Sequence, residues 1–126
     1  MSEICICGYG EAYIDCCHRY ISGDLFPETA LDLMKSRFTA YSKKEAAYIF
    51  DTTHPSVRHL TSIENIKDWA EETTWHKLEI VAAKENIVEF KATYKDLKGK
   101  EHVHHERSNF HFDNNKWYYV DGNYFD

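Results

Sequence analysis

The sequence is poor in the residues that break up a chain, with two prolines and five glycines in 126 residues. Such a composition contains no linker-like or low-complexity segment. Apolar runs also stay well short of the about 18 residues that a membrane helix requires. The start, MSEIC, lacks the basic and apolar regions of a signal peptide. We therefore expect a globular cytoplasmic chain, about one domain in length, without membrane contact.

Positive charge is scarce as well, because 15 Lys and Arg face 21 Asp and Glu, for a formal net charge of -6. General nucleic-acid binders usually carry a basic patch that displaces counterions from phosphate, so this function is disfavoured. The sequence also has no G-x-S-x-G motif, no glycine-rich phosphate loop and no dinucleotide fingerprint. Enzymatic activity is therefore without positive support, and a non-enzymatic role is favoured.

Four cysteines are present, and all lie in the stretch CICGYGEAYIDCCH. Cys5 and Cys7 form one pair, Cys16 and Cys17 form another, and a turn at Gly8 to Gly10 separates the two pairs. Thiolates clustered in a reducing compartment favour metal binding or redox chemistry over structural disulfides. The spacing predicts a small knuckle in which the four thiolates hold one zinc ion tetrahedrally.

Other uses of these cysteines stay open at this point. A redox pair would be expected as Cys-x-x-Cys at the start of a helix, a spacing that is missing here. Disulfides and unliganded buried thiols are two further alternatives. His18 follows Cys17 directly and could replace it as the fourth zinc ligand.

The pattern C-x-C-G-x7-C-C resembles the SEC-C motif, a small zinc-binding segment also found at the C-terminus of the protein-export ATPase SecA. Further segments follow in the order seen in the YchJ family of bacterial SEC-C proteins: CCHRYISGD, LMKSRFTAY, DTTHPSVR, VEFKATY, HERSNF and KWYYVDG. Two positions depart from that family, because Ile6 and Tyr9 stand where Pro and Ser are usual. The sequence also ends at Asp126 without the second SEC-C copy of some members, which would exclude a bivalent binding mode.

The resemblance implies a cone like that of nuclear transport factor 2 and other cystatin-like folds, in which a curved antiparallel sheet wraps around helices. The concave face of such a sheet often forms a pocket. By analogy with the SecA tail, the resemblance also implies a protein partner for the knuckle, of the chaperone or ribosome-associated kind. We expect residues 1–23 to form the knuckle and residues 24–126 to form the cone.

Periodicity independently predicts an α+β fold, in which helices precede a meander of strands. Apolar residues at helical spacing follow Pro27, which suits a first helical turn. A shorter helix is expected over residues 43–51, and Ser62 is expected to cap a third helix. From Trp75 onward the apolar residues alternate instead, with short connections suited to hairpins. The alternating residues are Leu78, Ile80, Ala82, Val88, Phe90, Ala92, Tyr94, Phe110 and Phe112.

Charged and polar residues on apolar faces give the candidate pocket. Arg37 interrupts the apolar stripe that includes Tyr41, and Glu106 and Ser108 share a strand face with Phe110. A buried charge must be paired or functional to offset its desolvation. We expect Arg37 to pair with Glu106, either to dock the helix on the sheet or to bind a ligand.

Two histidine features are weaker candidates. His54 precedes Pro55 at the predicted end of a helix, where its imidazole could cap carbonyl groups or serve the pocket. His102, His104 and Glu106 share a strand face and could form a second metal site, although no fourth ligand is evident.

Two functions follow, a zinc-stabilised binding module that contacts a protein partner through the knuckle and a small-molecule site in the cone. The second predicts a raised pKa for Glu106.

Overall fold

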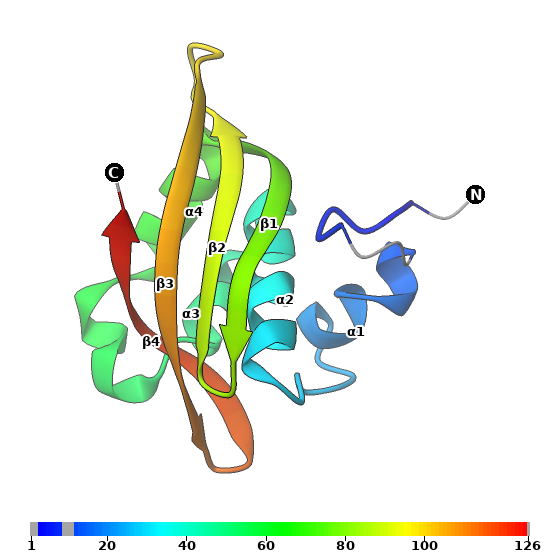
Figure 1. Cartoon of the computed structure of the whole chain (residues 1–126), viewed down its shortest axis with the longest axis vertical. Helices are drawn as coiled ribbons and strands as arrows, with labels where there is room; N and C mark the ends of the chain where they lie inside the picture. The colour runs from blue at the N-terminus through cyan, green and yellow to red at the C-terminus, as the bar shows by residue number, and fades with distance from the viewer. Residues whose placement is uncertain (1–2, 9–11, 126) are drawn as a thin grey trace.

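The computed structural model describes residues 3–8 and 12–125, which form short helices followed by four strands (Figure 1). Below, residues 3–8 and 12–23 are called the knuckle and residues 24–125 the cone. The elements, in order, are the 3-10 helix η1 (Tyr13–Asp15), the helices α1 (His18–Ile21), α2 (Ala30–Ser42) and α3 (Ala46–Asp51), the 3-10 helix η2 (Pro55–Leu60), the helix α4 (Ile63–Glu72), and the strands β1 (Thr74–Lys84), β2 (Ile87–Lys95), β3 (Glu101–Asp113) and β4 (Lys116–Phe125).

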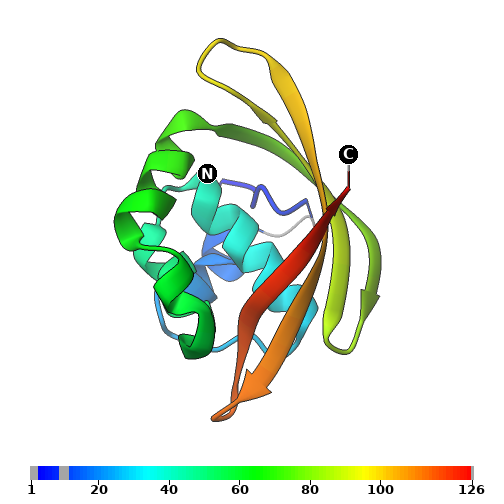
Figure 2. The ribbon, with the colours of Figure 1, turned by 90° about the vertical axis from the view of Figure 1, so that its left-hand side faces the viewer.

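The four strands form one antiparallel sheet in the order β1-β2-β3-β4, as a meander of hairpins requires. The sheet curves, and the helices of the cone all lie on its concave side (Figure 2). Residues with positive φ shape two of the turns, namely Gly99 at 81° and the pair Asn114 and Asn115 at 50° and 63°. The predicted architecture of helices packed on a curved antiparallel sheet is confirmed.

The helix boundaries differ from the sequence-based prediction at two points. Helix α2 starts at Ala30, where the Thr29 hydroxyl accepts a hydrogen bond from the Asp32 N–H, so Pro27 lies before its first turn. Helix α3 starts at Ala46 because Lys44 adopts a left-handed φ of 62°, which cannot continue a helix. Ser62 caps α4 as predicted, through the Asn65 N–H.

The core of the cone lies between α2 and the concave face of the sheet. Leu33 and Phe38 of α2 are buried, as are Val88 and Phe90 of β2, which follow the predicted alternation. On β1 the alternation fails at Ala82, which is exposed because an irregularity between Ile80 and Ala82 shifts the register. Phe112 is also exposed, by 54%, near the end of β3.

Strand β4 continues through Asp121 and Gly122 to Phe125, although an Asp-Gly pair is typical of a turn and predicts the end of the strand here. Gly122 pairs with Ser108 on β3, next to Glu106. A Cβ atom at position 122 would collide with the Glu106 side chain. Glycine therefore leaves room here for the Glu106 side chain and does not serve a turn.

The knuckle lies beside α2, at the β1 edge of the cone, away from β4 (Figure 1). Ile6 packs against the main hydrophobic core, and Ile21 packs against a second cluster formed by α2, α3 and α4. The predicted boundary between residues 23 and 24 therefore lies between two parts that touch through apolar side chains. Within the described ranges, no helix is both long and apolar enough to cross a membrane.

Candidate metal centre and cone pocket

Backbone hydrogen bonds shape the knuckle around its cysteines. The Gly8 N–H donates to the Cys5 carbonyl at 3.3 Å, and Gly8 has a φ of 88°, as expected for the turn behind Cys7. Tyr9 and Gly10, which were expected to continue this turn, lie outside the described residues. The second pair of cysteines follows η1, where the Cys16 N–H donates to the Tyr13 carbonyl at 3.0 Å.

The four cysteine sulfur atoms converge. All four Sγ atoms lie within 4.8 Å of one another, and the four residues are at most 8% exposed. Cys7 Sγ lies 3.6 Å from Cys16 Sγ, which lies 4.0 Å from Cys17 Sγ. Four sulfurs bound to one zinc at about 2.3 Å would be about 3.8 Å apart, so this donor set fits a tetrahedral ion. These separations exceed any disulfide bond, and none of the four cysteines is joined to another in a disulfide.

His18 does not join this group, although it follows Cys17 directly. The four ligand atoms that come together are all sulfur, and the His18 ring contacts Tyr13 edge-on at 5.3 Å between centroids. Hydrogen bonds from the Cys17 and Cys7 thiols lower the pKa of Cys5. The hydrogen bonds that Cys17 forms with Cys5 and with Cys7 raise the pKa of Cys17, and burial adds to the effect. Without a cation, neighbouring sulfurs thus share protons and do not ionise together.

The cysteine cluster rests on helix α2. Cys5 Sγ lies 3.6 Å from the Thr39 hydroxyl, which belongs to a fully buried residue of that helix. At the end of α2, the Lys43 ammonium pairs with Glu3 at 2.6 Å and lies 4.4 Å from the centre of the Tyr13 ring. These contacts hold both bends of the knuckle against the same helix.

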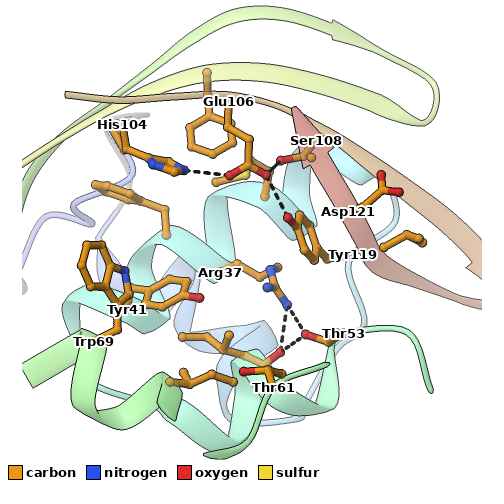
Figure 3. Close-up of a pocket in the computed structure, with 18 of the residues that line it drawn as sticks. Arg37, Tyr41, Thr53, Thr61, Trp69, His104, Glu106, Ser108, Tyr119 and Asp121 are labelled. Carbon is orange, nitrogen blue, oxygen red and sulfur yellow. Dashed lines mark hydrogen bonds and ion pairs between the residues drawn. The ribbon is translucent and has the colours of Figure 1, made fainter. Parts of the chain in front are cut away.

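A second candidate site is a cavity of about 670 Å³ between the helices and the concave face of the sheet. Its apolar wall includes Phe38, Trp69, Trp75 and Phe90. Arg37, Tyr41, Glu106 and Ser108 also line it, four of the five pocket residues that the sequence suggested. Figure 3 shows the labelled polar side chains of α2 and β3 facing this space from opposite sides.

Arg37 and Glu106 do not pair directly, so the expected ion pair is wrong. The Arg37 Nη1 donates to the Ile49 carbonyl at 2.8 Å and to the hydroxyls of Thr52 and Thr53 at 2.7 and 3.4 Å. The guanidinium lies 4.6 Å from the centre of the Tyr119 ring. Because the Tyr119 hydroxyl donates to Glu106, this ring stands between the two charges.

The Glu106 carboxylate is satisfied by its own neighbours on the sheet. His104 Nε2 donates to Oε1 at 2.7 Å, while the hydroxyls of Ser108 and Tyr119 donate to Oε2 at 2.6 and 3.0 Å. Burial opposes ionisation of this carboxyl, but the three hydrogen bonds outweigh it and lower the pKa of Glu106. The raised pKa that we expected for a small-molecule site is therefore wrong.

His104, which we had placed only in a candidate metal site, lines the cavity, whereas His54 does not. His54 Nδ1 accepts from the Ser56 N–H at the start of η2, and its Nε2 contacts Asp113 at 3.0 Å. It therefore caps the amino end of a 3-10 helix and not the carbonyls of α3. His104 lies two residues before Glu106 on β3 and so shares its strand face, and this spacing could have identified His104 as a pocket residue.

The histidine tract forms no metal site in the described part of the chain, where the four cysteines are the one group of ligands that converge. His102 contacts Asp96 at 2.9 Å and His104 contacts Glu106. On the opposite face of β3, His105 and Arg107 share the Glu89 carboxylate, at 2.8 and 3.0 Å. Each histidine is thus held by its own carboxylate.

Comparison with known proteins links the chain to one bacterial group. The family model described as "YchJ, middle NTF2-like domain" matches residues 29–122. A UPF0225 protein of Geobacter sulfurreducens is 39% identical over 129 residues, covering 97% of this chain and 80% of the relative. A UPF0225 protein of Haemophilus influenzae is 42% identical over 124 residues, covering 94% and 76%.

Two solved structures are similar over most of the chain. The solution structure of RPA3114, a SEC-C motif containing protein from Rhodopseudomonas palustris, has a TM-score of 0.87 and 34% identity and covers 97% of this chain and 98% of that one. The crystal structure of a SEC-C motif containing protein from Psychrobacter arcticus has a TM-score of 0.76 and 30% identity, covering 93% and 80%. The similarity to both structures includes the knuckle as well as the cone.

Proposed function

Because the chain belongs to the YchJ-like UPF0225 family of SEC-C motif proteins, we propose that it is a zinc-stabilised, non-enzymatic binding protein. In this proposal the knuckle, residues 1–23, holds one zinc ion and contacts a protein partner, while residues 24–126 form the cone that supports it. The observation that carries the proposal is the convergence of four buried cysteine sulfur atoms, none of them in a disulfide, within 4.8 Å.

Zinc suits this donor set better than other biological cations. It accepts four thiolates in a tetrahedron and has no redox chemistry of its own, whereas calcium and magnesium prefer oxygen ligands. A closed set of four protein ligands leaves no open position for a substrate, which is typical of structural sites. Four thiolates also require a reducing compartment, which supports a cytoplasmic location.

The test is the metal content of full-length protein purified without added metal, measured by mass spectrometry. We expect one equivalent of zinc in the wild-type protein and none in Cys16→Ser. Ser22→Ala serves as control, because this exposed hydroxyl in the same segment lies outside the sulfur cluster and should leave the zinc content unchanged. Metal-free wild-type protein, or zinc retained by Cys16→Ser, would contradict the proposal.

The surface of the knuckle supports the proposed contact with a protein. Ile4 is 63% exposed and Ile14 is 53% exposed, although the cysteines beside them are buried. Exposed apolar side chains that lie together can mark a protein interface, so these two isoleucines are where the proposal places the contact. We assign the occupant as a folded protein partner that covers these two isoleucines.

A photoreactive amino acid placed at position 14 tests this contact in cells. Position 97 is the matched control, because Leu97 is 78% exposed on the β2–β3 turn of the cone. We expect one cross-linked protein from position 14 and none from position 97, and loss of the product in the Cys16→Ser background. Equal cross-linking from both positions would contradict a knuckle-specific partner.

A second candidate function is small-molecule binding by the cone. It is favoured by the 670 Å³ cavity, into which a charged residue of α2 and a fixed carboxylate of β3 both project. Cavities of about 300 to 1,000 Å³ are typical of ligand sites.

A further inference from the structure

The cone cavity carries a more specific assignment, which rests on the second candidate function. We infer that the cavity binds a small, flat monocarboxylate whose anionic group meets Arg37 and Tyr41 and whose apolar body lies along the tryptophan wall. The inference is built from the charges, donors and rings that line the cavity.

Arg37 is a buried cation with no counter-ion among the described residues. It is 7% exposed, and no carboxylate in residues 3–8 or 12–125 forms an ion pair with it. Its partners are neutral oxygens and an aromatic ring, and its hydrogen bonds within the described residues all come from Nη1. The remaining N–H groups belong to a side chain that lines an open cavity. A buried guanidinium is stabilised most by a carboxylate, which it can bind through two parallel hydrogen bonds.

Glu106 does not fill this role. Its two oxygens accept hydrogen bonds from His104, Ser108 and Tyr119, and the Tyr119 ring separates it from Arg37. The three donors also offset its negative charge, which reduces its repulsion of a second anion. Asp121, the other carboxylate on the cavity lining, is exposed to water and accepts a hydrogen bond from Asn109 at 2.7 Å.

Tyr41 supplies a second donor beside the guanidinium. It lies four residues after Arg37 on α2, so both side chains project from the same face of the helix. Figure 3 shows its hydroxyl pointing toward Arg37 across the cavity. Burial raises the pKa of Tyr41, so the hydroxyl keeps its proton and can donate to a carboxylate oxygen.

The wall next to these donors is aromatic. Trp75 contacts Tyr41 at 6.2 Å and Trp69 at 6.5 Å between ring centroids, and all three residues line the cavity. Rings of this kind prefer edge-to-face or offset contacts with another flat ring. The combination of two donors and an aromatic wall selects a flat body that carries one anionic group.

Three probes with one ring system and different charges test this assignment by calorimetry on the zinc-loaded full-length protein. The probes are 2-naphthoate, the neutral 2-naphthamide and the cationic 2-naphthylmethylammonium. We expect naphthoate to bind about tenfold more tightly than the amide, a difference of about 1.4 kcal/mol, and the cation to bind more weakly still. Arg37→Met should weaken naphthoate binding by about tenfold, and Tyr41→Phe by a smaller factor.

Arg107→Met is the matched control, because it removes the same charge from the outer face of the sheet and should leave binding unchanged. If Arg37→Met does not fold, Tyr41→Phe and the probe series still decide the question. Equal affinity for naphthoate and the amide would overturn the carboxylate assignment but would still support small-molecule binding by the cone. If none of the three probes binds, cone binding fails as a function together with the assignment.

Discussion

The knuckle and the cone are stabilised by different means. The cone buries ten core residues in one cluster and joins its four strands through continuous antiparallel pairing. The knuckle buries little besides its four cysteines, with Tyr13 and Ile21 packed against them. A segment this small cannot obtain its stability from apolar burial, which is why structural zinc commonly replaces a core in such segments.

The two parts should therefore respond differently when a stabilising contact is removed. In the cone, stability is distributed over many contacts, so removal of one contact weakens the whole domain. In the knuckle, the proposed zinc ion would concentrate stability at one point, so its removal should release the segment and leave the cone folded. The two parts meet through the Cys5 contact with Thr39, the Lys43–Glu3 ion pair, and the packing of Ile6 and Ile21 on the two apolar clusters of the cone.

The largest effect on the cone is expected from Leu33→Ala. Leu33 is fully buried in the centre of the core, so its truncation should lower the free energy of unfolding by about 3 kcal/mol. Denaturant unfolding followed by circular dichroism measures this change. Leu97→Ala, on an exposed turn, is the control and should change little. A similar loss in both variants would contradict a cone that is stabilised by its core.

Gly122→Ala should cause the next largest loss in the free energy of unfolding, about 2 kcal/mol. The added methyl group would collide with the Glu106 carboxylate, which three donors hold in place. In the Glu106→Ala background, Gly122→Ala should cause almost no further loss, since the colliding atoms are then absent. The same denaturant titration gives the coupling between the two positions. Independent, additive effects would show that the Glu106 side chain is not what requires glycine at position 122.

Cys16→Ser should affect the cone least among these substitutions, by about 1 kcal/mol. The partial burial of Ile6 and Ile21 against the cone is lost when the knuckle detaches. The same change should abolish zinc binding. Denaturant unfolding of the sheet and zinc content, measured on the same samples, test the small loss of cone stability and the loss of zinc binding. A loss as large as that of Leu33→Ala would mean that the cone depends on the metal.

A smaller effect is expected from pH. The folded pKa of Glu106 lies below its unfolded value of about 4.3, so its ionised form stabilises the cone above that pH. This contribution should disappear as the pH falls through the folded pKa. The stability difference between wild type and Glu106→Gln should therefore be largest near neutral pH and shrink in acid. A difference that grows in acid would contradict the direction of the shift.

The sequence predicts the fold well because local patterns dominate it. The Ser62 cap, the hairpin turns and the alternation of Val88 with Phe90 are short-range signals, and the structure places each as expected. Errors occur where a distant residue decides. Gly122 lies within a strand, opposite Ser108, where the Glu106 side chain leaves no room for a Cβ atom, a relation that no local pattern contains.

The candidate sites differ in the same way. The four cysteines lie close in the sequence, so their spacing alone predicts that they converge. The cavity is assembled from distant segments, and sequence reasoning paired Arg37 with Glu106 although the Tyr119 ring stands between them. It also missed His104 as a cavity residue, because its neighbours in the sequence suggested a metal site.

The most direct test of the account is residue-resolved NMR of the full-length protein before and after removal of metal by a chelator. We predict that the amide signals of Cys5 to Gly8 and Tyr13 to Ile21 lose their dispersion while those of β2 and β3 keep their positions, and that added zinc restores the spectrum. Unchanged knuckle signals after complete removal of metal, or a collapse of the sheet signals at the same chelator concentration, would contradict it.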